Sequence, residues 1–131
     1  MQNLGNRGSV YNATYEELVS KIKSEAEDLN LDVECFVSDI EGEIVREIYT
    51  CKYEAIIINA AAYSHYSIAI RDALESFKGK KIEVHMTNIH AREQFRHNSV
   101  ISGVVDGVIC GFGAYSYILA LRAVSTMQNL L

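Results

Sequence analysis

Proline and tryptophan are both absent from the sequence, and charged residues make up only 22% of its 131 residues. Hydrophobic residues account for 49%, which is typical of a globular protein and excludes a collagen-like or disordered chain. No apolar run approaches the roughly 18 residues of a membrane span, and the N-terminal MQNLGNRGS lacks the apolar core of a signal peptide. We therefore expect a single domain over residues 1–131, in a soluble cytoplasmic protein that has no membrane partner.

A basic excess is also lacking, because 12 Lys and Arg face 17 Asp and Glu, for a formal net charge of −5. Binding to phosphates needs a basic face, so nucleic acid is not an expected partner. Cys35, Cys51 and Cys110 are odd in number and form no CxxC pair. They predict buried free thiols in a reducing compartment, rather than a disulfide framework or a zinc site.

Helical and strand patterns alternate along the chain. Thr14 to Glu17 has the Thr-x-x-Glu form of a capping box, and apolar residues follow at helical spacing. The predicted elements, in chain order, are a helix over 14–29, an edge strand over 31–37, a short helix over 42–49, a strand over 55–58, a helix over 67–77, a strand over 81–86, a polar stretch over 87–99, a strand over 107–112 and a helix over 114–127. This order predicts an α/β fold in which helices cover both faces of a parallel sheet.

Ligands of open parallel sheets bind outside the carboxyl ends of the strands. Here those ends are followed by Asn59 to His65, His85 to Asn88 and Gly111 to Ala114. Residues 85–97 hold three His, two Arg and one acid. A local cationic cluster in an acidic protein indicates a small anionic ligand, and a solvated loop with surface salt bridges is the alternative.

Glu83 and His85 lie two apart on a predicted strand, so they face the same side of the sheet. A carboxylate in that position can fix the tautomer of the imidazole and stabilise its charged form, as a general acid requires. A polar pair without a catalytic role is the alternative at this point.

Other motifs are less specific. The four histidines match neither HExxH nor a zinc-finger spacing, so the sequence predicts no metal site. Gly111-Phe112-Gly113 lacks the third glycine of a dinucleotide motif and predicts a tight turn. Tyr115 and Tyr117 are expected to pack on the closing helix. Residues 5–11 are loop-like, and within them Arg7 can lower the pKa of Tyr11, so this segment could form a lid that carries its own base.

Together these segments resemble one known family. Residues 83–99, EVHMTNIHAREQFRHNS, are similar at nearly every position to E-V-H-[IL]-[ST]-N-[IV]-H-A-R-E-x-F-R-x-x-S of the type II 3-dehydroquinate dehydratases. Residues 59–67 resemble that family's N-P-G-A-Y-T-H-T-S, and residues 38–43 its S-N-x-E-G-E. Residues 4–11 resemble its L-G-x-R-E-P-x-x-Y lid but are one residue shorter, and residues 111–121 resemble its last strand and helix.

The resemblance implies a flavodoxin-like, doubly wound parallel sheet in three α/β/α layers. It also implies a lyase of the shikimate pathway, and hence of aromatic amino acid biosynthesis, that reversibly removes water from 3-dehydroquinate through an enolate to give 3-dehydroshikimate. No cofactor or metal is implied. The implied assembly is a homo-oligomer of trimers joined into a dodecamer.

The resemblance also implies catalytic roles. Tyr11 is the implied general base, and Arg7 the group that holds Tyr11 as a phenolate. Asn59 is implied to contact the substrate and to stabilise the enolate, through an ordered water. His85, oriented by Glu83, is the implied general acid that protonates the departing hydroxyl.

Five further residues are implied to bind the substrate. Met86 and Thr87 would hold its carboxylate, and His65 and Arg96 its ring hydroxyls. Asp72 would reach the site of a neighbouring subunit.

The sequence departs from the family pattern at one main point. The family's first hydrophobic strand, which is central in the strand order 2-1-3-4-5, has no counterpart, so we expect a sheet that lacks this strand. In addition, Ala60 and Ala61 stand where the family has Pro and Gly. An alternative function is therefore a catalytically impaired member that acts as an assembly subunit or small-anion binder.

Overall fold

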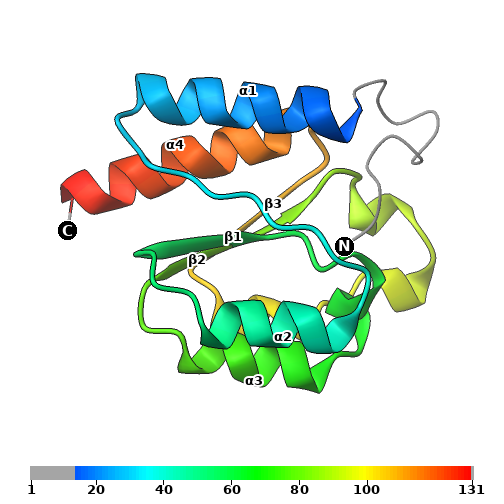
Figure 1. Cartoon of the computed structure of the whole chain (residues 1–131). Coiled ribbons are helices and arrows are strands. Elements are labelled where there is room, and N and C mark those ends of the chain that lie inside the picture. Colours follow the sequence, from blue (N-terminus) through cyan, green and yellow to red (C-terminus); the bar gives the residue numbers. More distant parts are fainter. Residues whose placement is uncertain (1–13, 131) are drawn as a thin grey trace.

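The computed structural model describes residues 14–130, and the layers of this part of the chain are clear in Figure 1. The helices are α1 (Tyr15–Asp28), α2 (Glu41–Tyr49), α3 (Ile68–Ser76) and α4 (Tyr115–Leu130), and the strands are β1 (Ala55–Ile58), β2 (Lys80–His85) and β3 (Gly107–Cys110). Four 3₁₀ turns connect them: η2 (Ala61–His65), η3 (Ile89–Ala91), η4 (Gln94–Arg96) and η5 (Ser102–Val104). These bounds confirm the predicted helices and three of the four predicted strands, with shifts at their ends.

The described strands form one parallel sheet in the order β1-β2-β3. Helices α1 and α4 lie on one face and α2 and α3 on the other (Figure 1), which confirms the predicted α/β/α layers. Leu18, Ile22 and Leu121 belong to the core on the first face, and Ile70 and Leu74 to the core on the second. Burial of these apolar stripes holds the helices onto the sheet.

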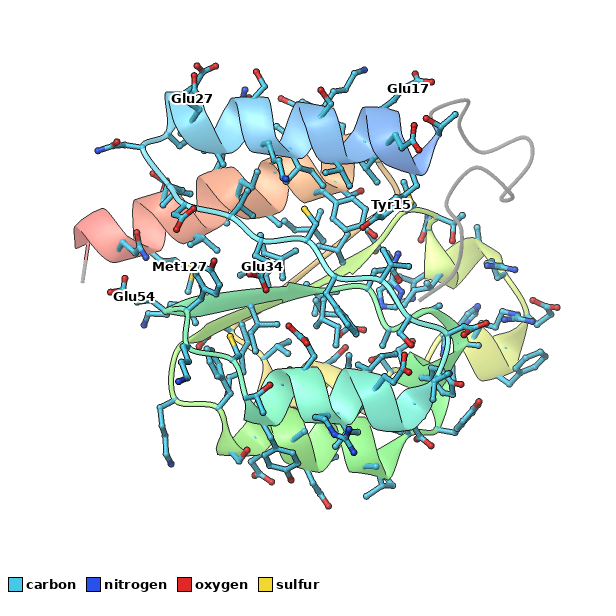
Figure 2. The ribbon with its side chains drawn as sticks, viewed as in Figure 1. Tyr15, Glu17, Glu27, Glu34, Glu54 and Met127 are labelled. Carbon is cyan, nitrogen blue, oxygen red and sulfur yellow. The ribbon has the colours of Figure 1, made fainter. Side chains whose placement is uncertain are left out.

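The prediction of an edge strand over residues 31–37 is wrong. The segment has no strand partner, although its apolar side chains Leu31, Val33 and Cys35 pack against the core under α1 and α4. A cavity of about 610 Å³ is bounded by this segment and by β1, and the labelled Tyr15, Glu34 and Glu54 lie around it (Figure 2).

Residues 31–37 do not pair as a strand because the cavity lies between them and the neighbouring edge of β1. A strand exists through backbone hydrogen bonds to a neighbour, and β1 hydrogen-bonds within the described sheet to β2 alone. Its other edge therefore faces the cavity.

The three cysteines are free, as predicted, but half-buried rather than buried.

Candidate functional site

The carboxyl end of β2 carries a buried acid–base pair, the carboxylate of Glu83 and the imidazole of His85. Strand alternation places Glu83 and His85 on one face, as predicted, and Nε2 of His85 hydrogen-bonds Oε2 of Glu83. Glu83 is fully buried and His85 is 5% exposed. A buried carboxylate is costly unless it is paired and hydrogen-bonded, so this contact is a specific feature of the fold.

Two serines complete the surroundings of the carboxylate. Ser99 donates its hydroxyl to Oε2 of Glu83 over 2.6 Å, and Ser102 donates to Oε1. Burial by itself raises the pKa of the Glu83 carboxyl, but the hydrogen bonds from His85, Ser102 and Ser99 outweigh burial and hold that pKa below its usual range. Glu83 is therefore an anion at neutral pH and accepts from all three donors.

Asn59 directly follows β1, whose last residue Ile58 is paired in register with Glu83. Its Oδ1 accepts the backbone N–H of Ala61 over 3.0 Å, and its Nδ2 donates to the Tyr117 hydroxyl over 3.0 Å. The side-chain amide is thus held at both ends. Because Nδ2 has two hydrogens, one N–H remains to donate at the carboxyl edge of the sheet.

The turn that contains Asn59 has an unusual backbone. Ala61 has a φ of 53°, in the left-handed region that costs a residue with a Cβ roughly 1–2 kcal/mol. Strain of this kind persists where neighbouring contacts over-determine the backbone. The hydrogen bond from the Ala61 N–H to Asn59 is such a contact.

His65 lies at the end of η2, and its Nδ1 is 2.7 Å from the carbonyl oxygen of Asn98. A carbonyl oxygen can only accept, so Nδ1 carries the hydrogen and Nε2 is the acceptor when this imidazole is neutral. The contact joins the segment after β1 to the polar stretch after β2.

The predicted carboxylate-binding pair follows His85 directly. Met86 is buried and Thr87 half-buried. The backbone N–H of Gly113 donates to the Met86 carbonyl over 2.9 Å, and that of Gly111 to the His85 carbonyl over 3.1 Å. The turn between β3 and α4 therefore fixes the backbone after β2. The φ values of 102° at Gly111 and 59° at Gly113 suit glycine.

Arg96 and Asp72 are not drawn into this cluster by any described contact. Arg96 pairs with Glu93 over 2.8 Å and lies 5.0 Å from the ring centre of Phe95. Asp72 is exposed on α3. Arg7 and Tyr11 lie outside the described residues.

Three contacts at the site were not predicted from the sequence. Ser99 and Ser102 lie 16 and 19 residues from Glu83, so no local spacing signals their contact with it. Tyr117 was expected only to pack on its helix. It is buried there, as expected, and its hydroxyl also accepts from Asn59 across 58 positions of sequence.

Between residues 14 and 130 there is no group of three or more His, Cys, Asp or Glu side chains arranged to hold a metal ion. No helix in that range is both long enough and apolar enough to cross a bilayer.

Comparison with known proteins gives consistent matches. A family model described as dehydroquinase class II matches residues 1–125. The 3-dehydroquinate dehydratase of Thermotoga neapolitana is 50% identical over 128 residues, which cover 96% of this chain and 88% of the relative. That of Pelobacter propionicus is 49% identical over 120 residues, which cover 89% and 80%. The crystal structure of type II dehydroquinase from Propionibacterium acnes has a TM-score of 0.89 at 40% identity and matches 94% of this chain and 88% of that one.

Proposed function

The chain belongs to the class II dehydroquinase family, and from this premise we propose how its residues carry out the reaction of a 3-dehydroquinate dehydratase. The activity is that of a hydro-lyase in the shikimate pathway, which leads to aromatic amino acids. It removes water from 3-dehydroquinate and gives 3-dehydroshikimate. The expected family and reaction agree with relatives at about 50% identity over most of the chain, and the expected fold agrees with the solved type II dehydroquinase. No finding favours the alternative of an impaired subunit or anion binder.

His85 is proposed as the general acid, and its contact with Glu83 is the observation that carries the proposal. Loss of water beta to a ketone requires a base, stabilisation of the enolate oxygen and an acid for the leaving hydroxyl. Glu83 occupies Nε2 of His85, which leaves Nδ1 to protonate the hydroxyl.

Asn59 is proposed to stabilise the enolate, through an ordered water. Its Nδ2 is held by Tyr117 and keeps a second N–H to donate. Preorganised donors of this kind lower the barrier because they need no reorientation as charge develops.

The remaining roles are proposed from the family resemblance. Tyr11 acts as the base and Arg7 keeps it as a phenolate. The carboxylate of the substrate binds at Met86 and Thr87.

The ring hydroxyls of the substrate bind His65 and Arg96, and Asp72 reaches a neighbouring subunit. The assembly of trimers into a dodecamer, the cytoplasmic location and a single domain over residues 1–131 stay predictions.

The test is turnover of 3-dehydroquinate, followed by the ultraviolet absorbance of the conjugated enone product. Tyr11→Phe and His85→Ala should each lower kcat by roughly 100-fold or more, in line with the loss of a general base or acid. Tyr115→Phe, at an exposed tyrosine of α4, is the matched control and should keep the parent rate. Near-parent turnover in either site variant, with an unchanged circular dichroism spectrum, would contradict the assigned roles.

A further inference from the structure

Two hydroxyls hold opposite oxygens of the Glu83 carboxylate. Ser99 donates to Oε2, the oxygen that also faces Nε2 of His85, and Ser102 donates to Oε1. Rotation of the carboxylate about its Cγ–Cδ bond would break at least one of these contacts. The two serines therefore fix the plane of the carboxylate, and with it the direction from which Oε2 accepts from the imidazole.

The loop that carries the serines is itself anchored. Nη1 of Arg71, on α3, donates to the Val100 carbonyl over 2.6 Å, and the Val100 N–H donates to the Ser64 carbonyl over 2.7 Å. Ile101, between the two serines, is fully buried. Both hydroxyls are thus presented from a loop that α3 and η2 hold in place.

The pattern of donors also determines where the protons lie. A serine hydroxyl has one hydrogen, and in these contacts both serines direct it to Glu83. The ionised carboxylate has no hydrogen to give, so its contact with His85 requires an N–H at Nε2.

We propose that Ser99 and Ser102 are positioning residues for the dehydration, which hold Glu83 so that His85 keeps its Nε2 hydrogen and releases only the Nδ1 proton. The inference rests on the proposed role of His85 as the general acid. When the C–O bond breaks, its electron pair stays on the hydroxyl oxygen, which takes the Nδ1 proton and leaves as water. His85 is then a neutral imidazole with its N–H at Nε2, still bound to Glu83.

Few other charged or titratable groups face this pair in the described part of the chain. Cys110 of β3 is the register partner of His85. Arg71 from α3 contacts the loop between the serines. Of the described ionisable groups, His85 exerts a charge effect on the Glu83 carboxyl, so a pH response of the pair reports mainly on these two residues.

The first test measures the tautomer in the parent protein. The ¹⁵N chemical shifts of labelled His85 are followed through its titration. Nε2 should remain protonated throughout, and Nδ1 should lose its hydrogen. A neutral form protonated at Nδ1 would overturn the inference, and this test needs no variant.

The second test uses kinetics. Ser102→Ala and Ser99→Ala should each lower kcat about 10- to 100-fold, as loss of an orienting partner does at metal-bound histidines, with little change in KM. Each variant removes a donor to the Glu83 anion, so the acid limb of the kcat profile should move to higher pH. Ser102→Thr keeps a hydroxyl and should restore most of both properties.

Ser76→Ala is the control, because Ser76 is an exposed serine at the end of α3 whose hydroxyl donates to the Ala73 carbonyl over 2.7 Å. It should leave kcat and the acid limb unchanged. An unmoved acid limb in both site-serine variants, while His85→Ala is inactive, would overturn this inference and leave the proposed function standing. An active His85→Ala would instead contradict the proposed function.

Discussion

The two sides of β1 are built differently. On the side of β2, strand pairing continues to the buried Glu83 and His85, and every oxygen of the Glu83 carboxylate has a donor. On the other side, an apolar cavity of about 610 Å³ separates β1 from residues 31–37, which pair with no described strand. Buried polar groups that are fully hydrogen-bonded specify one arrangement, whereas residues 31–37 pack on the core through their apolar side chains and have no strand partner.

Hydrogen exchange should show the largest contrast between the two sides. Amides of β2, such as that of Val84, lie in the middle of the sheet and should open only with global unfolding. Amides of Val33 and Cys35 have no strand partner and should exchange about a thousandfold faster or more, because local opening there costs little. Exchange is measured residue by residue by NMR. Equal protection of the two sets would contradict the comparison.

Core truncations should show the next largest contrast between the two sides of β1, as a difference in lost unfolding free energy. Leu74 is fully buried under the sheet, so Leu74→Ala should cost about 2–5 kcal/mol of unfolding free energy. Val33 borders the existing cavity, and Val33→Ala should cost less than about 1 kcal/mol, because fewer contacts are lost there. Urea denaturation measures both, and similar losses would show that the cavity side is as tightly packed as the core.

The charge of Glu83 should make stability depend on pH. Since the native pKa of Glu83 lies below its usual value, the stabilisation is complete above the unfolded-state pKa of about 4.3 and is lost as the pH falls through the lower native value. Glu83→Gln removes this dependence and should cost about 1–3 kcal/mol at neutral pH, because hydrogen bonds to a buried charge are lost. Urea titrations between pH 7 and about 3 should therefore converge for parent and variant at low pH. A constant difference would contradict this origin.

The same comparison explains which parts could be predicted from the sequence. Glu83 and His85 belong to one strand, where alternation alone places them together, and Ala55 to Ile58 is apolar enough to identify a buried strand. The alternating pattern of residues 31–37 also has the periodicity of a strand, but periodicity describes which side chains face the core and not whether a neighbour is present. The contacts of Ser99 and Ser102 with Glu83 depend on the path of a loop, which has no periodicity to read.

The smallest expected effect on unfolding free energy is at Ala61, shortly after the carboxyl end of β1. Its φ of 53° disfavours any residue with a Cβ, so Ala61→Gly should raise the unfolding free energy by up to about 1 kcal/mol, after the added flexibility of glycine in the unfolded chain is subtracted. Ala60 is the matched control, since it has an ordinary φ of −83° and is fully buried. Ala60→Gly should lower stability by about 1 kcal/mol, so opposite signs at adjacent alanines would identify backbone strain as the cause. Destabilisation by both substitutions would show instead that the turn tolerates the left-handed alanine without strain.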